Sequence, residues 1–176
     1  NVGFPGVAIN QDRRPVLKEG GKEIDAHGKY VMPGFVDMHG HIGGKSQGTP
    51  AEYVFKLWLA HGVTTIRDPS AGNGLDWVLD HKKKSAANTI TAPRIKAYTS
   101  FGQNIEKVDV VRTLPTSGAK KGGTETLKGP ITNATQAKSW VQANYKRVAD
   151  GIKFFGASPE VMQTALEENK RLGLGS

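Results

Sequence analysis

The 176-residue chain contains no cysteine. Disulfide bonds are therefore excluded, and a metal site in this chain cannot use thiolate ligands. No run of about 20 apolar residues occurs, so no segment has the composition of a membrane-spanning helix. The N-terminus has no initiator methionine and neither the basic start nor the apolar core of a signal peptide. Both ends of the chain are expected to be cut, which leaves open a cytoplasmic, periplasmic or secreted location.

The formal net charge of +8 raises the question of a nucleic-acid partner. Lysines cluster at 82–84 and 120–121 without the interleaved aromatic residues that stack on bases. The first cluster lies at a predicted helix end, where positive charge complements the helix dipole. We therefore expect these lysines to form a solvated face, with neither a nucleic-acid nor a membrane partner.

From residue 30 onward, strand-like and helix-like segments alternate. Strands are predicted at 30–41, 63–68, 94–100 and 151–155. Helices are predicted from Thr49 to about 61, at about 74–87 and 133–149, and from Ser158 to 172. Four β-α units in series predict a parallel sheet and an α/β fold. Because such strands are covered on both faces, the apolar segment 30–41 is expected to be buried.

The first predicted helix has a start signal and an apolar stripe. Thr49 is expected at the N-cap of a capping box, with proline at the next position and Glu52 after it. Tyr53, Leu57 and Ala60 recur at helical spacing, and they are predicted to form the buried face.

The most informative segment is Pro-Gly-Phe-Val-Asp-Met-His-Gly-His at 33–41. Side chains alternate along a strand, so Asp37, His39 and His41 are expected on one face. Two imidazoles on one face, where a strand ends, can bind a single divalent cation. Gly40 leaves the opposite face open to close approach by another element. The alternative is a strand end with two solvent-facing histidines.

This segment resembles the first-strand signature of the amidohydrolase superfamily. Gly-Val-Thr-Thr-Ile-Arg-Asp at 62–68 resembles the second barrel strand of the same family, in its prolidase-like and imidazolonepropionase-like branch. The resemblance extends from about residue 23 to the end of the chain. It implies the front half of a (β/α)8 TIM-type barrel at 30–176, since a complete barrel needs about 250 residues. It also implies that residues 1–29, with short strands at 7–9 and 16–17 and a turn at Gly20, are a fragment of a flanking β-sandwich domain.

The resemblance implies a metal-dependent hydrolase that cleaves a C–N bond of an amide, peptide or cyclic amide with metal-activated hydroxide. Its expected metal ligands in this chain are His39, His41 and Lys153, with one or two divalent ions, zinc by default. Two further histidines and the aspartate that serves as general base are expected beyond residue 176. The implied partners are a small-molecule or peptide-like substrate and, for the chain itself, a second copy or the remainder of its own barrel.

Lys153 lies in an apolar strand next to Ile152 and Phe154, where an unpaired ammonium is unfavourable. Burial lowers the pKa of a lysine, and a neutral amine can react with carbon dioxide to give a carbamate. The resemblance implies this carboxylated lysine, because Gly-Ile-Lys-Phe matches the fourth-strand position of binuclear amidohydrolases. The alternative is a lysine that reaches solvent at the strand end or pairs with Asp150.

Other polar residues near the motif leave alternatives open. Asp37 either orients an imidazole as a hydrogen-bond acceptor or serves as a structural carboxylate. For Arg67 and Asp68, which end the second strand, a local salt bridge and a substrate contact are both open. His61 is predicted to compensate the dipole of the first helix at its C-terminus.

The segment 103–130 is long, rich in glycine and without clear periodicity. It follows the carboxyl end of a predicted strand, the side on which barrel active sites lie. It is either an active-site loop that shapes the substrate pocket or a mobile insertion without chemistry. For the whole chain, the alternative to an enzyme is a non-catalytic half-barrel that binds metal or a partner protein through an exposed apolar edge at its fourth strand.

Overall fold

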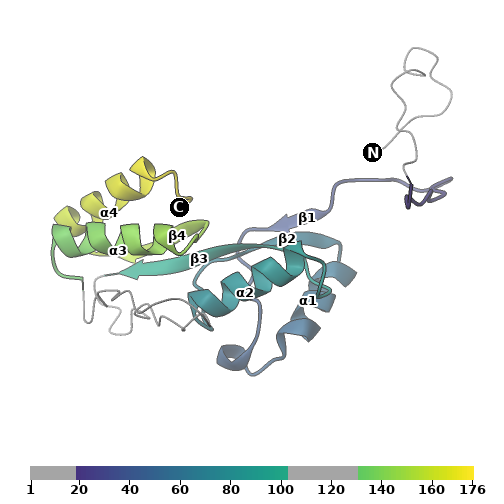
Figure 1. Cartoon of the computed structure of the whole chain (residues 1–176), viewed down its shortest axis with the longest axis horizontal. Coiled ribbons are helices and arrows are strands. Elements are labelled where there is room, and N and C mark those ends of the chain that lie inside the picture. Colours follow the sequence, from purple (N-terminus) through teal and green to yellow (C-terminus); the bar gives the residue numbers. More distant parts are fainter. Residues whose placement is uncertain (1–18, 103–130) are drawn as a thin grey trace, which may run out of the picture. The chain divides into compact units, whose positions relative to one another are not determined.

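The computed structural model describes residues 19–102 and 131–176 (Figure 1). The chain divides into two units, residues 1–33 and 34–176. Of the first unit, the described residues 19–33 contain turns at 19–20 and 27–28 and no strand. Gly20 has φ of 77°, in agreement with the turn predicted there. The strands expected at 7–9 and 16–17 and the loop expected at 103–130 lie outside the described residues.

The second unit is a series of strand–helix pairs. The strands are β1 (Phe35–Asp37), β2 (Val63–Asp68), β3 (Arg94–Gly102) and β4 (Gly151–Gly156), which pair in parallel in the order β1-β2-β3-β4. The helices are α1 (Ala51–Ala60), α2 (Leu75–Ala86), α3 (Ala134–Lys146) and α4 (Pro159–Arg171), preceded by the short 3-10 helix η2 (Lys45–Gln47). The predicted parallel sheet and the four β-α units are confirmed. No helix in 19–102 or 131–176 is long and apolar enough to cross a membrane.

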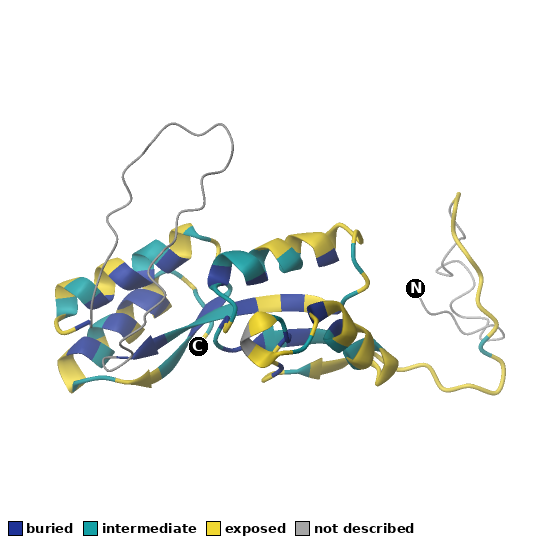
Figure 2. Cartoon of the chain, turned by 90° about the horizontal axis from the view of Figure 1, so that it is seen from below, coloured by how far each residue is buried: buried dark blue, intermediate teal, exposed yellow. Residues whose placement is uncertain are grey.

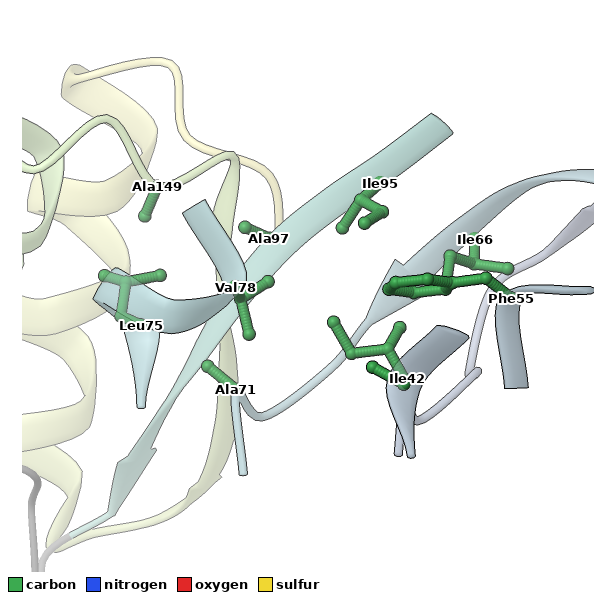
Figure 3. Close-up of a cluster of buried hydrophobic side chains, with 10 residues drawn as sticks. Ile42, Phe55, Ile66, Ala71, Leu75, Val78, Ile95, Ala97 and Ala149 are labelled. Carbon is green, nitrogen blue, oxygen red and sulfur yellow. The ribbon is translucent and has the colours of Figure 1, made fainter. Parts of the chain in front are cut away.

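Two clusters of buried side chains in the described residues join the strands to their helices (Figure 2). The first lies between β2, β3, α1 and α2, and its larger members are Ile42, Phe55, Ile66, Leu75, Val78 and Ile95 (Figure 3). The second lies between β3, β4, α3 and α4, and it includes Phe101, Trp140, Val141, Ile152 and Val161. Each fully buried aliphatic or aromatic side chain of this kind contributes roughly 1.5–3 kcal/mol to stability. Both clusters lie on the helix-covered side of the strands.

The predicted start and buried face of the first helix are wrong. The Thr49 hydroxyl donates to the Gln47 carbonyl at 3.4 Å instead of capping the helix, whose N-cap position is Pro50. The side chains of Tyr53 and Leu57 are 58% and 42% exposed, whereas Phe55 is fully buried. Since α1 carries apolar residues on more than one side, its buried face is set by the packing of Ala51 and Phe55 in the cluster with Ile66.

The first strand is much shorter than predicted and is not buried. It covers three residues, and Phe35 and Val36 are 55% and 57% exposed. The reason is that β1 stands at the end of the described sheet and has β2 as its neighbour on one side. The third strand is longer than predicted, because Phe101 and Gly102 continue the pairing with β4. The third helix is shorter than predicted and ends at Lys146, before Val148 adopts a φ of 66°.

The edge of β4 is covered at its first residues, which corrects the prediction of an unpaired edge there. Gly175 forms a parallel bridge with Gly151, and the Ile152 N–H donates to the Gly175 carbonyl at 2.9 Å. The Tyr98 side chain lies so close to both glycines that a Cβ at either position would overlap it. Residues 174–176 thus lie where the fifth strand of a barrel is expected.

A buried carboxylate connects the last two helices. Glu168 on α4 is 5% exposed and accepts hydrogen bonds from Gln142 on α3 at 2.7 Å and from Arg171 at 2.6 and 2.8 Å. The hydrogen bond from Arg171, followed by that from Gln142, lowers the pKa of Glu168 to about 2. A carboxyl group whose pKa is lower in the folded than in the unfolded chain stabilises the fold only while it is ionised.

We predict that Glu168→Gln in the full-length protein lowers the urea midpoint at pH 7. The difference from the unsubstituted protein should shrink as the pH falls below the ordinary glutamate pKa of 4.5 and should vanish near the folded-state value of about 2. The matched control is Glu167→Gln, since Glu167 contacts Gln163 on the same helix at 2.9 Å and is exposed. A midpoint difference that stays constant from pH 7 to pH 2 would contradict the assignment.

Candidate metal centre

His39 and His41 lie together just beyond the carboxyl end of β1. Their ring centroids are 5.4 Å apart, with an edge-to-face angle of 76°. They do not extend the strand as predicted, because residues 38–39 form a turn. The Gly40 N–H nevertheless donates to the Arg67 carbonyl at 3.1 Å, which keeps the segment beside β2. The structure therefore brings the two imidazoles together at the edge of the sheet where the sequence predicted them.

The backbone between the histidines is held on both sides. The Asp37 carboxylate accepts from the His39 N–H at 2.7 Å, so it fixes the turn through the main chain. On the opposite face, a Cβ at Gly40 would lie 3.1 Å from the ring of Trp58 on α1. The close approach predicted at Gly40 is confirmed, and the approaching element is α1. In the described part of the chain, the buried Trp58 Nε1 has no hydrogen-bond partner.

Asp68, the last residue of β2, supplies a carboxylate beside the pair. Its Oδ1 lies 3.8 Å from His41 Nδ1 and accepts from the N–H groups of Ser70 and Ala71 at 3.3 and 3.2 Å. Asp68 is 2% exposed, and this burial raises its pKa, although the backbone donors and the two histidines act in the opposite direction. For Arg67 and Asp68 the sequence left open a local salt bridge and a substrate contact, and the contact of Asp68 with His41 was neither of these. The signal was the position of Asp68 at the same end of the neighbouring parallel strand.

The loop after His41 is attached to the loop after β2. Ile42 is 1% exposed and belongs to the first buried cluster. The Asn73 side-chain amide donates to the Gly43 carbonyl, and the Gly43 N–H donates to the Gln47 side chain at 3.0 Å. Gly43 has φ of 73°, which a residue with a Cβ rarely adopts. These contacts hold His41 and Asp68 at one edge of the sheet.

Lys153 lies on β4, opposite Ser100 of β3, and is half-buried. Its Nζ is 4.8 Å from the ring centroid of Phe155, which is the geometry of a cation–π contact. The predicted alternative of a pair with Asp150 is wrong, because Asp150 binds Lys82 at 2.7 Å and Lys96 at 3.6 Å. The group beside the Lys153 amine is thus the ring of Phe155 and not the Asp150 carboxylate.

The donors in this region account for part of a metal site. Within residues 19–102 and 131–176, no group of three or more histidine and carboxylate side chains is placed to hold a metal ion. Two imidazoles at this separation fit two positions of a tetrahedral zinc site, which has four ligands. The pair is therefore compatible with a divalent cation, provided that other groups supply the remaining positions.

His61 lies at the C-terminal end of the first helix, where the sequence placed it. It is the C-cap residue of α1, and its Nδ1 lies 2.8 Å from the Leu57 carbonyl. It contacts the end of the helix and not the histidine pair, which makes it useful as a control residue.

Residues 22–87, from before β1 to the end of α2, match the model of the amidohydrolase family. Over 77 residues the chain is 42% identical to the adenine deaminase of Bacillus velezensis. The aligned region covers 40% of this chain and 13% of that protein. Over 103 residues it is 38% identical to adenine deaminase 2 of Desulfotalea psychrophila. The aligned region covers 52% of this chain and 18% of that protein. The resemblance to amidohydrolases is thus confirmed over the N-terminal part of the barrel. The matched regions span less than a fifth of the length of these relatives.

Solved structures confirm the fold. A crystal structure of an amidohydrolase aligns with a TM-score of 0.61 at 18% identity, over 92% of this chain and 46% of that one. A Xaa-Pro dipeptidase with bound methionine aligns with a TM-score of 0.56 at 21% identity, over 81% of this chain and 41% of that one. The four strand–helix units therefore share the fold of slightly less than half of each of these two chains.

Proposed function

We propose that the protein is a metal-dependent amidohydrolase that hydrolyses a C–N bond, with His39 and His41 as metal ligands. The observation that carries this proposal is the edge-to-face pair of imidazoles at the carboxyl end of β1. In (β/α)8 enzymes, this end of the strands is where catalytic residues gather. The match of residues 22–87 to the amidohydrolase family supports the same assignment.

A divalent ion bound here would supply Lewis acidity and lower the pKa of a bound water. The residues of the chain would bind this ion and orient its ligands. His39 and His41 would each present one ring nitrogen, and the buried Asp68 carboxylate lies beside His41 to favour one orientation of that ring. Lys153 is the proposed third ligand, as a carbamate. Zinc is the proposed metal, because imidazole is among its usual ligands.

The proposed substrate is a small molecule with a hydrolysable C–N bond. The relatives matched by sequence are named adenine deaminases, so adenine comes first in a substrate panel. A Xaa-Pro dipeptide and a cyclic amide complete the panel and represent the peptide and lactam bonds expected from the sequence motif. The alternative, a non-catalytic half-barrel that binds metal, predicts metal binding without turnover of any of the three.

In the full-length protein, we predict that His39→Ala combined with His41→Ala abolishes bound metal and turnover together. Both imidazoles are removed, so the ion loses two of its ligands. The measurements are metal content by mass spectrometry and the rate of hydrolysis across the panel. His61→Ala is the matched control, since it removes an imidazole that contacts only the end of α1, and it should retain metal and turnover.

Two outcomes would count against the proposal. Normal metal content in the double variant would refute the ligand assignment. Normal metal content in the unsubstituted protein, with loss in the double variant and no turnover of the panel, would favour the non-catalytic alternative.

For Lys153, we predict that metal uptake by the apo protein depends on bicarbonate. Lys153→Arg cannot form a carbamate, so its uptake should be weak and independent of bicarbonate. Lys96→Arg is the control, because Lys96 lies on the neighbouring strand and pairs with Asp150. The second measurement is a carbamate signal in the ¹³C NMR spectrum after addition of ¹³C-bicarbonate. Equal uptake with and without bicarbonate, and no such signal, would exclude the carbamate and leave the histidine pair standing.

A further inference from the structure

The backbone around His39 lies where the sheet no longer fixes it. Strand β1 ends at Asp37, and residues 38–39 form a turn. The position of a side chain in such a turn depends on how firmly the backbone of the turn is held. The Asp37 carboxylate holds the main chain of His39, and the contacts of Met38 and Gly40 hold the turn on either side of it.

Both flanking residues are bound by one residue of the neighbouring strand. The Arg67 Nε donates to the Met38 carbonyl at 2.8 Å, and the Arg67 carbonyl accepts from the Gly40 N–H at 3.1 Å. Arg67 thus contacts the residue before His39 with its side chain and the residue after it with its main chain. The main-chain contact is available to any residue at position 67, whereas the side-chain contact needs a donor that reaches across to β1.

The guanidinium of Arg67 is itself supported from the next strand. Its central carbon lies 4.7 Å from the ring centroid of Tyr98 on β3. The Tyr98 ring in turn lies against the backbone of Gly151 and Gly175, where a Cβ would overlap it. Contacts therefore continue across the sheet from the Met38 carbonyl to the β4 edge. A planar guanidinium can stack on a ring and donate in its own plane at the same time, which a lysine ammonium cannot do.

We infer that Arg67 is a positioning residue for the histidine pair: its side chain fixes the 38–40 turn and thereby the direction of the His39 imidazole. This inference rests on the proposed function, because it assigns Arg67 a role toward the metal that the pair would bind. Residues that orient metal ligands typically change metal affinity roughly 10- to 100-fold when they are replaced. We expect a loss of that size on removal of the Arg67 side chain.

The test measures cobalt(II) binding to the full-length apo protein, by competition with a chromophoric chelator and by the absorption spectrum of the bound cobalt. The variants are Arg67→Ala and Arg67→Lys. Arg94→Ala is the matched control, since Arg94 is an arginine on β3 whose Nε contacts Thr65 at 3.3 Å instead of the turn. Thermal unfolding of each protein separates a loss of stability from a loss of affinity.

We expect both Arg67 variants to bind cobalt(II) roughly 10- to 100-fold more weakly and with an altered spectrum, and Arg94→Ala to match the unsubstituted protein. Added guanidinium ion should partly restore affinity to Arg67→Ala, because it can occupy the vacated position, but not to Arg67→Lys. If Arg67→Ala does not fold, Arg67→Lys alone carries the comparison.

Several outcomes would overturn the inference. Unchanged affinity and spectrum in the Arg67 variants would do so, whatever their thermal stability. A raised KM with unchanged cobalt affinity would assign Arg67 to substrate binding instead. If the unsubstituted protein does not bind cobalt(II), both the proposed function and this inference are overturned. If it binds cobalt(II) and the Arg67 variants bind it with the same affinity, only this inference is overturned.

Discussion

The parallel pairing of β1 with β2 is the constraint on which the candidate site depends. Phe35 and Asp37 lie in register with residues at the start and near the end of β2, and the Gly40 N–H still reaches the Arg67 carbonyl beyond the end of β1. Parallel strands end at the same edge, so this pairing places His39 and His41 beside the last two residues of β2. Those two residues provide a carboxylate next to His41 and a guanidinium on the turn before His39.

Apolar contacts on the helix-covered side of the sheet hold the segment that carries the two histidines. Phe55, Ile66 and Ile42 belong to one buried cluster, so the segment that follows the histidines is tied to α1 and β2 by apolar contacts (Figure 3). Trp58 of the same helix packs against Gly40, the residue between the two histidines. The glycine between the histidines thus allows the helix to approach the segment that carries both imidazoles.

Much of this fold could be predicted from local sequence. Strand β2 is β-branched and bounded by Gly62 and Pro69, and its predicted limits agree with the structure. The positions of α2 and α4 follow from helical spacing and from glycines at their ends. The length of β1 could not be predicted in this way. An apolar composition favours a strand, but the strand extends only as far as it pairs with a neighbour, and the pairing with β2 covers three residues.

The two imidazoles could be placed from sequence, but their neighbours could not. The contact of Asp68 with His41 and that of Arg67 with Met38 join residues 27 and 29 positions apart, and both depend on the register between strands. The contacts of Lys153 could not be predicted from sequence either. Its predicted partner Asp150 binds two other lysines, while the ring of Phe155 lies near its amine.

A crystal structure of the full-length protein grown with zinc, with anomalous data at the zinc edge, tests the central claim most directly. The account predicts an anomalous peak about 2.0–2.1 Å from a ring nitrogen of both His39 and His41. A peak at another site, or no peak at the pair in crystals soaked to saturation, would contradict it.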